Sequence, residues 1–253
     1  MMLFYLSAVL FSDSEEIKEM VCELEERSKI RRLSMNIGKT AMICSNNEEI
    51  EIMIDGKKIV KVDEVVYLGQ NISMGNRTAD EVERRIALAW KKFWLLKSVF
   101  KGKITISNKT KILNSCVLPT LKYGSQTWAT NKNDERKIKV MQNSMERSMM
   151  GIRLRDRISL NTIRNRIKNR IDSLHDIKRQ KWDWAGHVSR QNEKRWTYCS
   201  KNWFLKTGRK KGKQKTRWDD DIVKFLGNRL YHRVAHDRRE WLRLREAYAR
   251  SRA

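Results

Sequence analysis

The sequence is poor in proline and glycine, with 1 and 11 residues respectively, and it has no long apolar run. So little proline and glycine, beside 40% hydrophobic and 34% charged residues, excludes collagen-like and low-complexity chains. A membrane-spanning helix needs roughly 20 consecutive apolar residues, and no stretch approaches that length. The opening MMLFYLSAVLF has no Lys or Arg before it, so we expect a buried strand over residues 5–11 and no signal peptide. A folded, mostly helical protein without a membrane segment is therefore expected.

Cysteine and histidine are also scarce, with four of each. The cysteines form no C-x-x-C pair and stand at Cys22, Cys44, Cys116 and Cys199. This spacing favours neither a zinc site nor a disulfide framework, and it predicts reduced thiols in an intracellular protein, in the nucleus or the cytoplasm. His232 and His236 would share a helix face, but they lie in no H-E-x-x-H frame. We expect no bound cofactor, no small-molecule substrate and no catalytic set of nucleophile, base and acid.

Acidic residues are the third shortage, since 30 Asp and Glu stand against 55 Lys and Arg and leave a net charge of +25. Residues 1–133 hold 21 basic and 16 acidic side chains, whereas residues 134–253 hold 34 and 14. Self-repulsion of this size favours a polyanionic partner, so RNA or DNA is the first expectation. A merely soluble basic surface and an anionic membrane are the alternatives.

One stretch, residues 33–73, has a dense β signal. Within it Asp55-Gly56 stands between two alternating apolar runs, which is the strongest short hairpin signal that a sequence offers. A further apolar run ends at Gly69. We expect a small antiparallel sheet with charged edges, covered by the apolar stripe of one helix over about residues 14–28.

Most of the remaining sequence has helical periodicity. Apolar residues at spacings of three and four predict helices over residues 78–100, 109–118, 134–151, 160–171, 173–188 and 238–249. The third of these carries Ile138, Met141, Met145 and Met149 on one side, a stripe that usually fills a core. Residues 206–217 have no apolar residue and predict a flexible basic loop. The expected fold class is α+β, a small sheet with one packed helix followed by a mainly α-helical basic region.

Three basic residues directly precede a tryptophan, in Lys181-Trp182, Arg195-Trp196 and Arg217-Trp218. Rings that stack on bases, interleaved with cations that neutralise phosphates, are typical of single-strand and RNA binding. Core packing is the alternative for most of the tryptophans, and Trp182 or Trp196 is expected to be exposed. The predicted nucleic-acid-binding residues of this region are Arg84, Arg85, Lys91, Lys92, Lys181, Trp182, Arg195, Trp196, Arg209, Lys210, Lys211, Lys213, Lys215 and Arg217.

The acidic triplet Asp219, Asp220 and Asp221 is the remaining candidate for a cation site. Three adjacent carboxylates could hold a divalent cation. They stand at the predicted start of a helix, however, where capping and the helix dipole account for acidic side chains. We therefore expect no metal there.

Eight stretches follow one another in a recognisable order: VLFSDSEEIKEM, LSMNIGKTAMI, VVYLGQNIS, RRIALAWKKFWLLKSVFKGKI, CVLPTLKYGSQTW, MERSMMGIRLRDRI, KWDWAGHVSR and TRWDDDIVKFLG. In order and spacing they resemble the C-terminal part of reverse transcriptases from non-LTR (LINE-type) retrotransposons. The resemblance implies a right-hand RNA-directed DNA polymerase. It implies that residues 1–76 are the last part of the palm, residues 77–133 a thumb-like helical region and residues 134–253 a basic helical C-terminal region.

The same resemblance assigns roles to single residues. Asn36, Lys39 and Thr40 look like the palm motif that follows the catalytic hairpin. Such a lysine would lie near the incoming triphosphate and assist the departure of pyrophosphate, as a cation or a general acid. A solvated turn residue is the plain alternative for Lys39. Tyr67 and Gly69 look like part of the hairpin that grips the primer end and are added to the predicted nucleic-acid contacts.

The sequence departs from the family at the catalytic centre. Leu6 and Ser7 occupy the positions of the two aspartates that hold Mg²⁺ in the family, and the fingers and upstream palm are not in this sequence. Two-metal catalysis needs carboxylates that bind both ions, so we expect this chain alone to be inactive and to retain nucleic-acid binding. The alternatives are a fragment that is active only with a complementing polymerase half, a domesticated basic protein that scaffolds a protein partner, and a chain without function.

Overall fold

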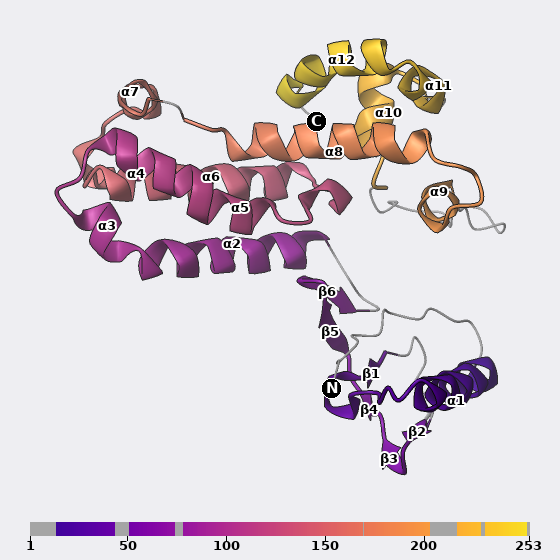
Figure 1. Cartoon of the computed structure of the whole chain (residues 1–253). Coiled ribbons are helices and arrows are strands. Elements are labelled where there is room, and N and C mark those ends of the chain that lie inside the picture. Colours follow the sequence, from indigo (N-terminus) through magenta and orange to yellow (C-terminus); the bar gives the residue numbers. More distant parts are fainter. Residues whose placement is uncertain are drawn as a thin grey trace. The chain divides into compact units, whose positions relative to one another are not determined.

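The computed structural model describes residues 14–43, 51–73, 78–168, 170–202, 217–228 and 231–251. Within these ranges helices dominate and the strands pair only in twos, so the expected α+β class is confirmed (Figure 1). The chain divides into two compact units, Met1–Arg77 and Thr78–Ala253. The strand expected over residues 5–11 lies outside the described residues.

The first unit combines one helix with three short strand pairs. Its elements are α1 (Ser14–Ile30), the 3₁₀ turn η1 (Ile37–Lys39), β1 (Ala41–Met42), β2 (Met53–Ile54), β3 (Lys57–Lys58), β4 (Val60–Lys61), β5 (Glu64–Tyr67) and β6 (Gln70–Ser73). The pairs β2–β3 and β5–β6 are antiparallel, whereas β1–β4 is parallel. The expectation of one antiparallel sheet is therefore wrong. Strands of two residues form too few ladder bonds to specify a common sheet, so tertiary burial decides how they pair.

Both hairpins of the first unit turn on a pair of residues with positive φ. Asp55 and Gly56 have φ of 47° and 71°, and Leu68 and Gly69 have 47° and 75°. Two successive left-handed residues define a primed turn, whose twist matches that of the flanking strands. The predicted Asp-Gly hairpin is thus confirmed.

Burial in the first unit is concentrated under α1. Met42, Ile52, Ile54 and Ile59 form its buried cluster, against which the α1 residues Ile17 and Val21 pack. These residues come from β1, from the β2–β3 hairpin and its flanks, and from the helix. The apolar stripe of α1 therefore covers the strands as expected.

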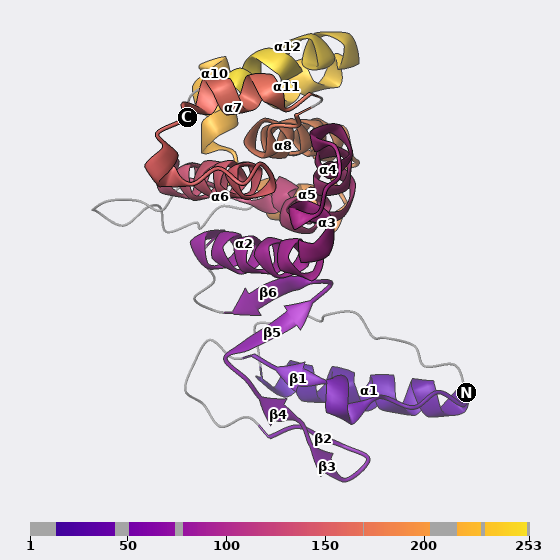
Figure 2. The ribbon, with the colours of Figure 1, turned by 90° about the vertical axis from the view of Figure 1, so that its left-hand side faces the viewer.

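The second unit is helical. Its elements are α2 (Thr78–Leu95), α3 (Lys97–Lys101), α4 (Ile106–Ile112), the π-helical turn η2 (Leu113–Val117), α5 (Leu118–Lys122), η3 (Ser125–Thr127), α6 (Lys132–Met149), η4 (Leu154–Asp156), α7 (Leu160–Arg166), α8 (Ser173–Ser189), α9 (Trp196–Asn202), α10 (Asp220–Leu226), α11 (Tyr231–His236) and α12 (Arg238–Arg250). Helix α8 lies between α5 and α6 on one side and α10 to α12 on the other in both views (Figures 1 and 2). It thereby borders two hydrophobic cores.

The larger core joins α2 to α6 and reaches α8. Phe93 of α2 is fully buried and stacks on Phe100 of α3, with ring centroids 4.3 Å apart. The predicted stripe of α6 is confirmed as core, because its isoleucine and three methionines are at most 3% exposed. Gly151 ends this region with a φ of 69°, which favours glycine after a helix. The core draws on residues from both sides of position 134.

The smaller core is built around two tryptophans that bind each other reciprocally. Trp182 of α8 and Trp241 of α12 stack with centroids 3.9 Å apart. Each indole N–H donates to the backbone carbonyl of the other residue, at 2.8 Å from Trp182 and 3.0 Å from Trp241. A Cβ at Gly186 would lie 2.3 Å from Trp241 Nε1, so only glycine leaves room for this ring. The pair fastens α12 to α8.

We expect Gly186→Ala to lower the free energy of unfolding by about 1–3 kcal/mol, because the added methyl group clashes with the Trp241 ring and displaces it. Urea unfolding followed by circular dichroism measures the change. Gly38→Ala is the matched control, since its new Cβ would meet nothing closer than 3.5 Å. Equal stability of Gly186→Ala and the unsubstituted chain would contradict the packing described here.

Candidate nucleic-acid interface

The predicted contacts Lys181 and Trp182 are core residues, and this part of the prediction is wrong. Their exposed fractions are 3% and 0%. Lys181 Nζ donates to Asp221 Oδ2 at 2.8 Å, and the same carboxylate oxygen accepts from the Tyr248 hydroxyl at 2.8 Å. Burial lowers the pKa of Lys181 and raises the pKa of Tyr248. These residues tie α8, α10 and α12 together and present no cation to solvent.

The acidic triplet Asp219, Asp220 and Asp221 also forms contacts within this C-terminal core. Asp219 accepts from the Tyr231 hydroxyl at 3.3 Å, and Asp220 accepts from the backbone N–H of Arg217 at 2.7 Å. Asp221 binds Lys181 as described. Within the described ranges no group of three or more His, Cys, Asp or Glu side chains could hold a metal ion.

Arg85 was also predicted to face nucleic acid, and this prediction is wrong. Its side chain is buried, and Nε donates to Glu81 Oε1 at 2.8 Å. The guanidinium lies over the Tyr123 ring, 4.8 Å from the centroid. Residues four apart share a helix face, and this face of α2 packs on α5. Arg84 is partly exposed and holds both oxygens of Glu81, each at 2.8 Å.

Other predicted contacts do lie at the surface. Lys91, Lys92 and Arg195 are exposed, as is Lys39 of η1. In the β5–β6 turn Gly69 is exposed, whereas Tyr67 is half-buried. Arg217 is half-buried, and its backbone N–H donates to Asp220. Predicted residues outside the description are Leu6, Ser7, the Trp196 side chain, Arg209, Lys210, Lys211, Lys213 and Lys215.

Three carboxylates of the C-terminal half are buried and form contacts inside the fold. Glu146 is 1% exposed and binds Arg170 at 2.8 Å, and its burial raises its pKa. Glu135 binds the buried Lys178 at 2.9 Å. Asp134 accepts from the backbone N–H of the Asn131 cap and completes a capping box at the start of α6. Acidic side chains held in this way cannot neutralise cations elsewhere on the surface.

A signal that pattern reading overlooked lies in residues 84–133, which contain 11 Lys and Arg but no Asp or Glu. Two of its lysines cap α6, since Lys101 and Lys109 donate to the carbonyls of Ser148 and Met149 at 2.9 and 3.3 Å. Lys122 binds Asp176 at 2.7 Å. The exposed lysines of the segment are Lys91, Lys92, Lys97, Lys101, Lys103, Lys111 and Lys132. Lys91 and Lys92 were predicted, and the absence of carboxylates over 50 residues, which is visible in the sequence, would have identified the other five.

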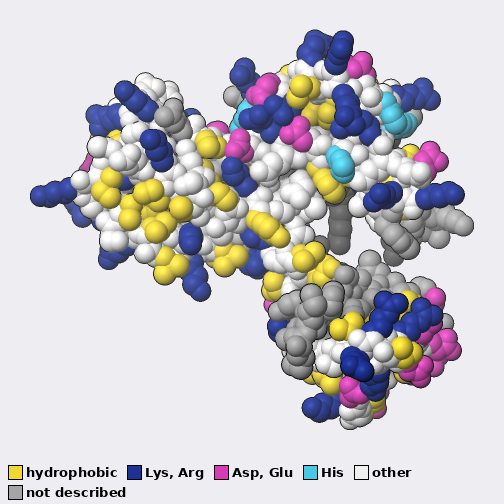
Figure 3. Space-filling model, viewed as in Figure 1, with side chains coloured by type: hydrophobic (Ala, Val, Ile, Leu, Met, Phe, Trp, Pro, Cys, Tyr) yellow, Lys and Arg dark blue, Asp and Glu magenta, His cyan; other side chains and the backbone are white. Residues whose placement is uncertain are grey.

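A second exposed basic cluster was likewise overlooked. It lies in and around η4 and α7 and consists of Arg153, Arg155, Arg157, Arg166 and Lys168. Dark-blue side chains surround the end of the second unit where α3, α4 and α7 lie (Figure 3). The two clusters together give this unit an extended basic surface.

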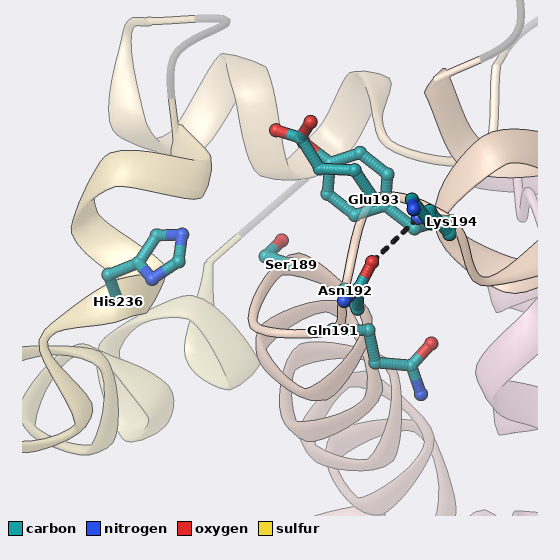
Figure 4. A pocket seen from close by; sticks show the side chains of 7 residues that line it. Ser189, Gln191, Asn192, Glu193, Lys194 and His236 are labelled. Atoms are coloured by element: carbon teal, nitrogen blue, oxygen red, sulfur yellow. Dashed lines mark hydrogen bonds between the residues drawn. The ribbon is translucent and has the colours of Figure 1, made fainter.

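A polar pocket of 410 Å³ lies between the end of α8, α9 and α11 (Figure 4). Its lining residues are Ser189, Gln191, Asn192, Glu193, Lys194, Tyr198 and His236. Ser189 is buried, and its Oγ accepts a hydrogen bond from Lys201 Nζ at 2.8 Å. Among the described residues no hydrogen bond joins His236 to Ser189 or Glu193.

The cysteines and the apolar content of the helices can also be compared with the sequence predictions. Cys22, Cys116 and Cys199 are free and exposed, and Cys44 lies outside the described residues. None of the helices within the described ranges combines the length and the apolar composition that crossing a bilayer requires. The chain has a basic helical unit and a small α/β unit, and their described residues contain no cluster that could hold a metal ion.

Comparison with known proteins relates this basic chain to mobile genetic elements. It is a distant homologue of a transposon-derived protein of Caenorhabditis elegans that has not been characterised. The two are 29% identical over 88% of this chain and 86% of the relative. No protein-family model and no solved structure matches the chain.

We expect Lys181→Gln to lower the free energy of unfolding by about 3–5 kcal/mol, because it leaves buried Asp221 without its cation. The salt dependence of nucleic-acid binding should not change under conditions where the variant is folded, since a buried ammonium group releases no counterion. Urea unfolding and binding titrations measure the two effects. Unchanged stability with a reduced salt dependence would restore Lys181 as a surface contact.

Proposed function

We propose that the chain derives from the reverse transcriptase of a non-LTR retrotransposon and binds nucleic acid without catalysing polymerisation. The observation that carries the binding proposal is the exposed lysine set of the carboxylate-free segment 84–133. The segment itself contains no Asp or Glu, so these cations have no acidic neighbour within it. Phosphates supply the missing countercharge.

Three features support the reverse-transcriptase origin. The homologue in Caenorhabditis elegans is transposon-derived. The family-like motifs follow one another in order along both units. Lys39 is exposed on η1, Tyr67 ends β5 and Gly69 lies in the tight turn that follows, a geometry compatible with the palm and primer-grip roles that the resemblance implies. With Leu6 and Ser7 in place of the family's aspartates, the two-metal step has no ligands in this sequence.

Binding of this kind depends on charge more than on base sequence. Each lysine that neutralises a phosphate releases condensed counterions, so affinity falls steeply as salt rises. Contacts to phosphate position the protein but carry no direct sequence information. We therefore propose RNA and DNA as ligands and expect little discrimination between base sequences.

Replacing one exposed lysine of the segment should reduce the salt dependence by a countable amount. For Lys91→Gln we expect the slope of log affinity against log salt on single strands to become shallower by about 0.7, with the fold unchanged. Fluorescence anisotropy with labelled RNA and DNA oligonucleotides of mixed sequence measures it. Lys18→Gln is the matched control, because Lys18 lies in the other unit and is paired with Glu15 at 2.9 Å. No binding at low salt would refute the proposed function.

A primer-extension assay tests the catalytic half of the proposal. The chain, given Mg²⁺, deoxynucleoside triphosphates and a primed template, is expected to add no nucleotide because the metal-binding aspartates are replaced. Extension above the background of a Lys39→Ala preparation would contradict the inactive state. A protein partner that remains bound after nuclease treatment, together with absent nucleic-acid binding, would favour a scaffold instead.

A further inference from the structure

The last two turns of α2 expose a tryptophan beside two exposed lysines, Lys91 and Lys92. Trp94 is 47% exposed and the neighbouring Leu95 is 70% exposed. Large apolar side chains are costly to leave in water, and a half-exposed indole beside an exposed leucine indicates a contact surface. The larger core accounts for Phe93 in the same turn, which is fully buried, but not for the outer face of Trp94.

The Trp94 ring is held in a fixed orientation. It stacks on Trp90 with centroids 5.9 Å apart and an interplanar angle of 16°. The Phe93 ring meets it edge-on, with centroids 5.3 Å apart at 87°. Phe93 is in turn stacked on Phe100 in the core. A ring positioned from two sides loses little conformational entropy when a ligand stacks on its free face.

Lysines lie on both sides of Trp94 in the sequence. Lys91 precedes Trp94 by three residues on α2, so the two share a helix face, and Lys97 begins α3 three residues after it. Both lysines are exposed. The nearest acidic residues in the sequence are Glu83 and Asp134, at the two ends of the carboxylate-free segment. The exposed indole can stack on a base, and the two lysines can bind its flanking phosphates, because the segment contains no carboxylate to repel them.

We propose that Trp94 is a stacking platform for an unpaired base of single-stranded RNA or DNA, with Lys91 and Lys97 binding the adjoining phosphates. This inference rests on the proposed function and adds a ligand class to it. A base inside a duplex already stacks on its neighbours and cannot cover the indole, so the platform selects single strands. The charge of the segment favours this occupant over an apolar protein surface.

The test compares oligonucleotide binding by the full chain and its variants. Trp94→Ala should bind a mixed-sequence single strand roughly tenfold more weakly while its affinity for duplex DNA stays within about twofold. Trp94→Leu keeps an apolar side chain but loses the π-face and should show the same loss, whereas Trp94→Phe should recover part of it. Leu95→Ala is the matched control and should bind as the unsubstituted chain does. Circular dichroism establishes that each variant is folded.

The outcomes separate this inference from the proposed function. Single-strand affinity that is equal in Trp94→Ala and the unsubstituted chain would overturn the platform and leave nucleic-acid binding intact. Absence of binding to any oligonucleotide at low salt would remove both. Equal losses in Trp94→Ala and Leu95→Ala, on duplex and single strand alike, would overturn the platform in favour of a general apolar surface. Binding to vesicles of anionic lipid that is lost in Trp94→Ala, with oligonucleotide binding unchanged, would also overturn it.

Discussion

The reciprocal pair of Trp182 and Trp241 is the contact on which the C-terminal half depends. Two indoles that stack and bond to each other's backbone fix the position of α12 on α8, and Gly186 leaves the space that they need. The buried bond between Lys181 and Asp221 adds α10 to the same assembly. Such a bond contributes specificity of arrangement more than net stability, since both charges lose hydration. These contacts give the C-terminal helices one defined core.

Ion pairs inside the fold also affect the charge of the surface. Asp221, Glu135 and Glu146 lie within the fold beside cations, while many lysines and arginines remain in solvent. The net charge of +25 is therefore not evenly neutralised over the surface but is left on faces such as that of residues 84–133. A polyanion lowers the self-repulsion of such a surface, which is the physical basis of the proposed binding. Distant homology to a transposon-derived protein of Caenorhabditis elegans agrees with the proposed binding of nucleic acid.

The sequence predicts those features of the fold that depend on local periodicity and turn residues. The methionine stripe of α6, the turn at Asp55 and the α+β class all follow from spacing and turn chemistry. It failed where tertiary packing decides, as in the pairing of two-residue strands. Adjacency of Lys181 and Trp182 suggested a surface, but the spacing of Ile177, Lys181, Ala185 and Val188 marks a buried helix face. For the same reason Lys91 and Trp94, three apart, form a better candidate contact than two neighbours in sequence.

Lysine footprinting of the free and nucleic-acid-bound chain most directly tests the division between cations that hold the fold and cations that face a ligand. Amine labelling followed by mass spectrometry should leave Lys181 and Lys178 unmodified in both states, because both are buried and ion-paired. Lys91, Lys92 and Lys97 should react in the free chain and become protected when a single-stranded oligonucleotide binds. Ready labelling of Lys181 in the folded chain, or equal labelling of the three α2–α3 lysines with and without bound oligonucleotide, would contradict the account.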